Sequence, residues 1–134
     1  MANSQAMCTS FKGELLTGTH NFTPSTGDTF KAALYLTSAS LGAGTTAYSS
    51  SGEVSGAGYT GGGVNVTNAT APTTGGTTAY WTPSASIVYT SVTLTTAFDA
   101  VLIYNASKSN KSVSVHTFGC LLYTSDAADD TPCV

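Results

Sequence analysis

The chain has 134 residues, a length that suits one domain with a single hydrophobic core. Charged residues make up only 8% of it, with 4 Lys and Arg against 7 Asp and Glu, so the sequence offers no basic surface for nucleic acid. Its apolar runs stop short of the roughly 18 residues that a membrane helix needs.

The first predicted element is a short helix over residues 7–17. Cys8, Phe11 and Leu15 recur at helical spacing and form a narrow apolar stripe. Gly18 suits the left-handed position at which many helices end. A helix this short has little stability alone, so we expect it to pack on a sheet or on a neighbouring subunit. Cys8 is expected to be a buried, inert thiol.

A strand is predicted over residues 29–36, where apolar side chains point one way at Phe30, Ala32, Leu34 and Leu36, and Lys31, Ala33 and Tyr35 point the other. Residues 37–51 are rich in small side chains and are expected to form a long loop.

Residues 52–63 contain six glycines, three of which complete a G-x-G-x-x-G pattern. The dinucleotide fingerprint needs a strand before this pattern, a helix after it and an acid about 20 residues on. No acid lies between Glu53 and Asp99. We therefore expect an irregular bend that lets the backbone pass close to a neighbour and leads into a short strand at 64–67, without a bound nucleotide.

The next stretches read as a turn at 71–76, a strand at 77–82 that Pro83 ends or confines to an edge, and an alternating strand at 86–95. Residues 100–104 are continuously apolar, as in a strand that is covered on both faces. Residues 112–118 alternate instead, with Val113, Val115 and Thr117 on one face.

The polar residues 105–111 between these last two strands carry two of the four lysines and are expected to stay out of the core. The pair therefore predicts a β-hairpin with a central first strand and a wetter second one. Many short strands with Gly, Ser and Thr turns predict an all-β fold, a β-sandwich or jelly roll, with one short N-terminal helix.

No catalytic, cofactor or metal site is predicted. His20 and His116, with Asp28, Asp99 and abundant serine, contain the residue types of a hydrolytic triad, but no nucleophile-elbow pattern is present. Cys8 and the two histidines lack metal-ligand spacing. We expect one histidine to be bonded in a turn and the other to lie on the polar face of a strand.

Aromatic residues are the candidate binding surface. A sugar-stacking platform is one interpretation of Tyr35, Tyr48, Tyr59, Tyr80, Trp81 and Tyr89; a place in the core or in a subunit interface is the other. The residues predicted for an interface are Phe11, Leu15, Tyr48, Tyr59, Tyr80 and Trp81.

Residues 120–134 differ from the rest of the chain. Residues 120–129 resemble one translated frame of the adapter used in short-read sequencing libraries. This tail holds three of the seven acids and two of the three cysteines, which leaves four acids against four lysines in residues 1–119. With Cys8 alone, a disulfide framework or a cysteine zinc site is excluded. We expect a single β domain at 1–119, truncated at its C-terminus, and a non-native tail at 120–134 without ordered packing.

Residues 7–119 resemble a family of small structural proteins of tailed bacteriophages. The resemblance is carried by ordered blocks at residues 7–22, 30–35, 52–62, 102–105 and 113–119. It implies a non-enzymatic virion component, either a head decoration or cement protein or a neck or tail accessory. The implied partners are copies of the chain and other virion proteins, with no cofactor. The alternative is a glycan-binding accessory module of the particle.

The expected location is the virion, after synthesis in the cytoplasm of the bacterial host. Residues 1–6 show no charged region followed by an apolar one, so no signal peptide is predicted there.

Overall fold

The structure, a computed structural model, describes residues 2–124 of the chain and the side chains of residues 2–118. Its elements in chain order are β1 (Ala6–Met7), α1 (Thr9–Leu16), β2 (Phe30–Leu36), β3 (Gly56–Ala57), β4 (Val64–Asn65), β5 (Thr73–Gly75), β6 (Thr78–Tyr80), β7 (Thr93–Asn105) and β8 (Lys111–Thr124). The predicted all-β fold with one short helix is confirmed, and it consists of two antiparallel sheets of unequal size.

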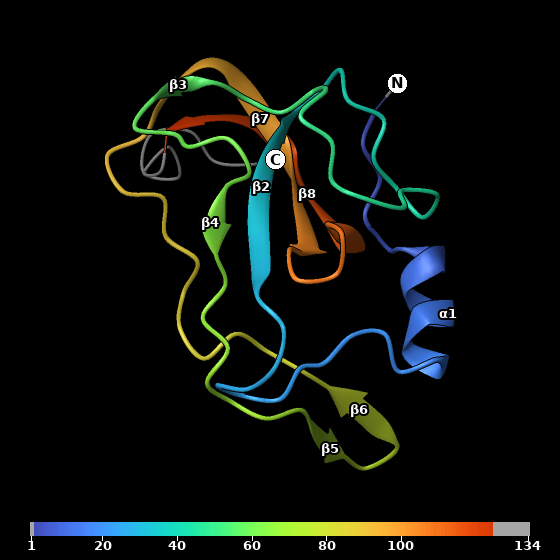
Figure 1. Ribbon diagram of the computed structural model, residues 1–134. Coiled ribbons are helices and arrows are strands. Elements are labelled where there is room, and N and C mark those ends of the chain that lie inside the picture. Colours follow the sequence, from blue (N-terminus) through green and yellow to red (C-terminus); the bar gives the residue numbers. More distant parts are fainter. Residues whose placement is uncertain (1, 125–134) are drawn as a thin grey trace.

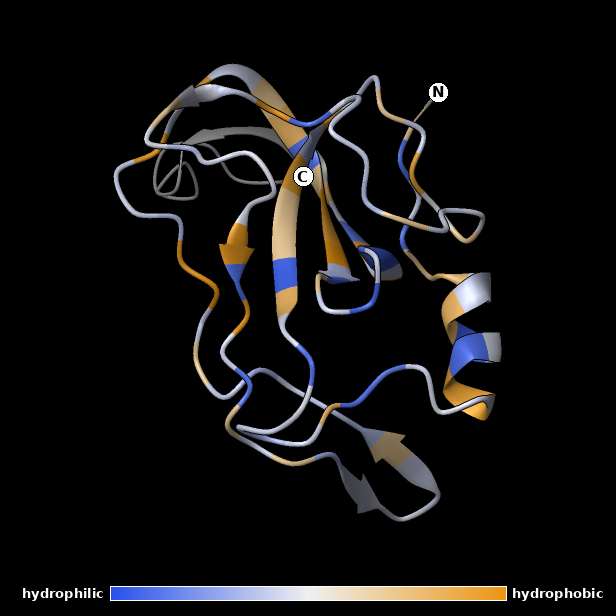
Figure 2. Cartoon of the chain, in the orientation of Figure 1, coloured by the Kyte–Doolittle hydropathy of each residue, from blue (hydrophilic) through white to orange (hydrophobic). Residues whose placement is uncertain are grey.

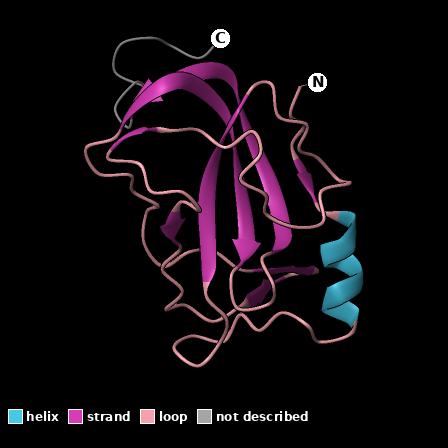
Figure 3. Ribbon diagram, turned by 45° about the horizontal axis from the view of Figure 1, so that its top comes forward, coloured by secondary structure: helices cyan, strands magenta, loops and turns pink. Residues whose placement is uncertain are grey.

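The larger sheet has six strands in the order β1-β8-β7-β2-β4, with β3 paired to one end of β7. Its strands are all antiparallel, and β5 and β6 form a separate two-stranded sheet. In Figure 1, α1 lies beside the sheet and the β5–β6 hairpin lies apart from it. Figure 3 shows β7 and β8 as long, strongly curved strands.

The predicted central hairpin is confirmed as β7 and β8. Val113 and Val115 of β8 are buried while His116 is exposed, so β8 has the expected wetter face. The turn takes two residues, Ser109 and Asn110, into left-handed backbone conformations. The prediction that residues 105–111 stay out of the core was wrong for the first of them, because the amide of Asn105 is fully buried and hydrogen-bonded.

Strand β2 occupies the middle of the core. Ala33 and Tyr35 are buried on one of its faces, and Ala32 and Leu34 on the other. Figure 2 shows hydrophobic residues along β2 and β7, which pair over nearly the whole length of β2. Burial on both faces explains why β7 carries a continuous apolar run rather than an alternating one.

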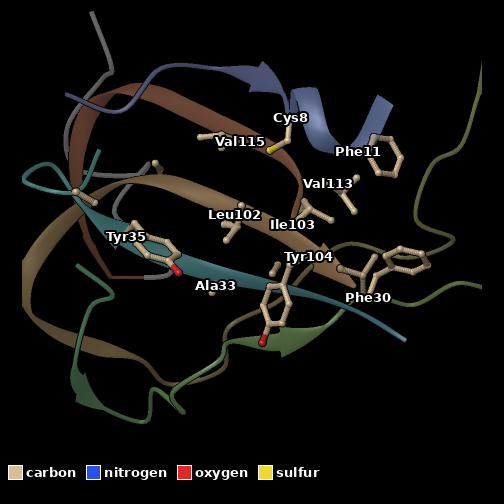
Figure 4. Packing of buried hydrophobic residues seen from close by; sticks show 14 residues of the cluster. Cys8, Phe11, Phe30, Ala33, Tyr35, Leu102, Ile103, Tyr104, Val113 and Val115 are labelled. Carbon is tan, nitrogen blue, oxygen red and sulfur yellow. The ribbon is translucent and has the colours of Figure 1, made fainter. Parts of the chain in front are cut away.

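The helix is shorter than predicted and buries a narrower stripe. Cys8 precedes its first turn and Phe11 is its one buried residue; Figure 4 shows both beside the valines of β8. Leu15 is 44% exposed, so its predicted place in the stripe was wrong: after Phe11, the side chain of α1 that contacts β8 is Glu14, which bonds Lys111. Gly18 ends the helix with φ of 70°, as predicted, and the Thr19 N–H bonds the Glu14 carbonyl at 3.0 Å.

Helix α1 has eight residues, and no helix within residues 2–124 is long and apolar enough to cross a membrane.

Two predictions between residues 71 and 95 were wrong. The predicted turn at 71–76 contains β5, which pairs with β6 around Gly76. The strand predicted at 86–95 begins only at Thr93, and Val88 is 62% exposed. Residues 86–92 pair with no strand; instead Ile87 and Tyr89 pack against the core, and the Tyr89 hydroxyl donates to the Ala32 carbonyl of β2 at 2.7 Å.

The glycine-rich stretch is the irregular bend that was predicted. Gly63 has φ of 75°, and a Cβ there would overlap the carbonyl oxygen of Ala32. Gly58 has φ of 79°, and a Cβ there would overlap the carbonyl oxygen of Ser91. Both positions need glycine because the backbone passes directly against a neighbouring segment.

The predicted domain boundary after Gly119 falls inside β8. The backbone of this strand runs to Thr124, with Leu122 opposite Phe98 and Thr124 opposite Thr93. The backbone of residues 120–124 is part of this strand, whereas the expectation that the tail lacks ordered packing concerns side chains that the structure does not describe. The rest of the predicted tail, and the side chains of residues 119–124, lie outside what the structure describes.

Candidate functional site

The glycine-rich bend, together with Tyr48 of the loop before it, closes around the carboxylate of Glu53. Oε2 of Glu53 accepts a hydrogen bond from the Tyr48 hydroxyl at 2.6 Å. Oε1 accepts one from the Tyr59 hydroxyl and one from the Gly62 N–H, both at 2.7 Å. These four residues form the Glu53 cluster, in which both carboxylate oxygens have partners from the chain itself.

The Glu53 cluster is tied to the central strands. The Tyr59 hydroxyl also accepts a hydrogen bond from the Leu34 N–H of β2 at 3.0 Å. The ring of Tyr48 stacks on Tyr104 of β7 with centroids 4.7 Å apart, and the Tyr104 hydroxyl donates to the Gly62 carbonyl at 2.8 Å. The cluster therefore fastens the bend to the sheet.

Electrostatics keep these tyrosines protonated. Burial, followed by the hydrogen bond to the Glu53 carboxylate, raises the pKa of both Tyr48 and Tyr59 well above the usual range. Burial likewise raises the pKa of Tyr35 and Tyr89. All four act as hydroxyl donors at neutral pH, which suits a structural clasp rather than a catalytic base.

A second polar group, the His20 network, joins α1 to the turn end of the β7–β8 hairpin. Nε2 of His20 lies 2.6 Å from Oε2 of Glu14, and Nδ1 lies 3.0 Å from Nδ2 of Asn105. The Asn105 amide is oriented by the Ser107 N–H, which donates to Oδ1 at 3.0 Å. Nδ2 then donates to Nδ1, and Nε2 is the ring nitrogen that faces the Glu14 carboxylate.

Two carboxylates complete the network. Oδ2 of Asp28 accepts hydrogen bonds from Nδ2 of Asn105 at 2.7 Å and from the Asn21 N–H at 2.8 Å. Nζ of Lys111 lies 2.9 Å from Oε1 of Glu14. Burial alone raises the pKa of both acids, but these hydrogen bonds and nearby positive charges outweigh it, so the pKa of Glu14 and that of Asp28 are lowered.

Neither histidine is placed for acid–base catalysis. The His20 side chain is fully buried with both ring nitrogens engaged. His116 lies on the exposed face of β8 with Nε2 at 2.9 Å from the Ser114 hydroxyl, and within residues 2–118 no acid bonds to it. His116 lies on the polar face of its strand, as expected; His20 is hydrogen-bonded, as expected, but it lies in the irregular segment after α1 rather than in a turn. In the same residues, no three His, Cys, Asp or Glu side chains gather as metal ligands.

The predicted interface residues divide into two groups. Phe11 is buried in the core, and Tyr48 and Tyr59 are half-buried in the Glu53 cluster. Leu15 is 44% exposed and Tyr80 is 48% exposed, so these two remain on the surface.

Trp81, the sixth predicted interface residue, is half-buried. Its ring lies 4.9 Å from that of Phe22 and 5.5 Å from that of Phe30, and its Nε1 donates to Oδ1 of Asn68 at 2.8 Å. It therefore anchors the base of the β5–β6 hairpin.

The six aromatic residues considered for sugar stacking do not form an exposed row. Tyr35 is buried, and among the six only Tyr80 belongs to the exposed class. Flat stacking on a sugar needs accessible rings beside polar groups. This distribution gives little support to a glycan platform.

Sequence reasoning missed the Glu53 cluster, and also the exposed apolar side chains of Met7, Leu16, Val88 and Phe118. A signal for the first existed: Glu53 is the one acid between Asp28 and Asp99, with tyrosines close on both sides. A lone acid in an uncharged stretch indicates a carboxylate with fixed internal partners.

Comparison of the chain with protein-family models, with curated proteins and with solved structures finds no match.

Proposed function

We propose that this chain is a non-enzymatic structural subunit of a bacteriophage particle, acting as a head decoration protein or as a neck or tail accessory. It works by adhering to copies of itself and to other virion proteins. The sequence resemblance supplies the phage context. The observation that carries the structural role is that the polar side chains of the Glu53 cluster and the His20 network bond one another within the chain.

The surface supports the same role. Exposed apolar residues lie on several elements, including Met7 on β1, Leu16 on α1 at 90% exposure, and Val88 on the segment before β7. Residues 54–98 contain no charged side chain. A surface with so little charge limits the solubility of a free monomer, and coverage by neighbouring subunits removes that liability.

The test compares phage particles with and without the gene for this protein. We expect the protein to be present in purified wild-type particles, and particles without it to assemble but to lose infectivity faster on heating or in low salt, or to attach poorly. Complementation with the intact gene is the control. A protein that is absent from purified particles and stays monomeric at all concentrations would contradict the proposal.

A further inference from the structure

The β5–β6 hairpin leaves its two outer edges open. Residues 71–80 are all exposed, and the hairpin is separate from the six-stranded sheet (Figure 1). An isolated two-stranded hairpin is marginally stable, and proteins usually protect exposed strand edges with charges, prolines or a covering segment. This hairpin lacks the protection that charges give, since residues 54–98 contain no charged side chain.

The register of the hairpin shows which backbone groups face outward. Gly75 pairs with Thr78 across a two-residue turn, and Thr74 pairs with Ala79. The pair that closes such a turn exchanges hydrogen bonds, and the next pair does not. Thr74 and Ala79 therefore point their N–H and C=O groups away from each other, toward the outer edges of β5 and β6.

The two edges differ in their next outward position. On the β5 side this position is Pro72, which has no N–H to donate. On the β6 side it is Trp81, whose backbone keeps both groups and whose side chain is anchored on Phe22 and Phe30. The outer edge of β6 thus presents complete and firmly positioned hydrogen-bonding groups.

We propose that the outer edge of β6 pairs with the same edge of a second copy of this chain, antiparallel about a two-fold axis at Ala79. A second copy offers an edge of equal length, equally uncharged, with matching groups at Ala79. The two-fold places each Ala79 N–H against the carbonyl of the other copy and joins the hairpins into one four-stranded sheet. This inference rests on the proposed self-assembly and names the surface that produces it.

The side chains of β6 fit this arrangement. The ring of Tyr80 lies over Gly75 of its own hairpin: a Cβ added to Gly75 would be 3.6 Å from Cε1 of Tyr80. Tyr80 nevertheless remains 48% exposed. In the paired sheet, Tyr80 would lie opposite Thr78 of the second copy, a cross-strand neighbour without charge. Strands of three residues bury much less than the roughly 800 Å² per partner of a standard interface, so this contact is one of several in an assembly.

Disulfide trapping tests the geometry. The full chain carries Ala79→Cys, with Cys120→Ser and Cys133→Ser to remove the exchangeable thiols of the tail. Opposite residues of a hydrogen-bonded pair have Cα atoms about 5.5 Å apart, within disulfide range. Thr74→Cys is the matched control. It lies on the same face of the hairpin and is also exposed, but in the paired sheet the two position-74 residues would be three strand spacings apart, about 14 Å.

We expect the Ala79→Cys chain to form a covalent dimer on mild oxidation and the Thr74→Cys chain to stay monomeric. No dimer from Ala79→Cys, or equal dimer from both variants, would overturn the inference.

A non-covalent measurement separates this inference from the proposed function. Ala79→Lys places two like charges against each other across the axis, whereas Thr74→Lys does not. By sedimentation over a concentration series, we expect Ala79→Lys to weaken self-association roughly fivefold or more and Thr74→Lys to leave it unchanged. If the unmodified chain associates and Ala79→Lys associates equally well, the β6 edge is wrong while the structural role stands. A chain that never associates overturns the β6 pairing, and it overturns the structural role as well if the protein is also absent from purified particles.

Discussion

At the scale of single residues, the hydroxyl of Tyr59 has two functions. It donates to Glu53 and accepts from the Leu34 N–H, so it joins the bend to β2. The fully buried Asn105 has the same double use, since its amide bonds both His20 and Asp28. Side chains of this kind hold separate segments together through a few directed bonds rather than through apolar area.

Removing the Tyr59 hydroxyl should therefore be costly. Tyr59→Phe keeps the ring but leaves the Leu34 N–H unpaired and Glu53 one donor short, and we expect a loss of about 1–3 kcal/mol in the free energy of unfolding. The control is Tyr80→Phe, an exposed tyrosine, for which we expect a change within about 0.5 kcal/mol. Urea unfolding followed by fluorescence measures both, and equal values for the two variants would show that the Glu53 cluster contributes no stability.

Residue-level prediction from sequence succeeded where the rule was local. Gly18 was identified as the helix stop because a left-handed residue is needed there, and Cys8 was identified as buried. Asn105 was misplaced because its amide is satisfied by His20, 85 residues away in the chain. No local pattern indicates that a polar residue after an apolar strand has such a distant partner.

At the scale of elements, the bend and the helix offer a matched pair of glycines. Gly63 has a positive φ and sits against the Ala32 carbonyl, whereas Gly13 lies in α1 with open space around its Cβ position. We expect Gly63→Ala to destabilise the fold by about 3 kcal/mol or more, through backbone strain and overlap together.

Gly13→Ala should instead stabilise it by about 0.5–1 kcal/mol, because alanine favours the helical backbone. Thermal unfolding of both purified variants measures the contrast. A Gly63→Ala protein as stable as the parent would mean that the bend can move away from β2.

Among the elements, the β7–β8 hairpin was predictable because an unbroken apolar run and an alternating run flank a polar turn. The β5–β6 hairpin was only half predicted, because Thr, Gly and Ala in residues 73–79 carry no burial pattern when every side chain is exposed. The strand predicted at 86–95 failed for the opposite reason: Ile87 and Tyr89 do pack against the core, but from a segment whose backbone pairs with no strand before Thr93.

At the scale of the whole molecule, most charged side chains within residues 2–118 take part in hydrogen bonds or ion pairs. Two of the four acids in residues 1–119, Glu14 and Asp28, belong to the His20 network, and the pKa of each is lowered in the fold. A carboxyl with a lowered folded pKa contributes stability that is present above its unfolded pKa and lost as the pH falls through its folded pKa.

We therefore expect the melting temperature to fall as the pH drops below the ordinary values of 4.5 for Glu14 and 3.8 for Asp28. In this range the unfolded chain takes up protons before the folded one does. Lys111→Met removes the cation next to Glu14. The variant should therefore melt at a lower temperature than the parent at neutral pH, and its melting temperature should fall less than that of the parent on acidification. Calorimetry across pH 3–7 measures both melting temperatures. A variant whose pH profile runs parallel to that of the parent would contradict the prediction.

The strand order also determines when this protein can fold during synthesis. Strand β2, apolar on both faces, leaves the ribosome about 60 residues before β7, the neighbour with which it pairs over nearly its whole length. Until β7 and β8 emerge, the nascent chain has a hydrophobic strand without its main partner, and pairing over such a separation is intrinsically slow. The sheet should therefore form only after β7 and β8 have been made, and the yield of the protein in a cell should depend on chaperones that protect β2 in the interval.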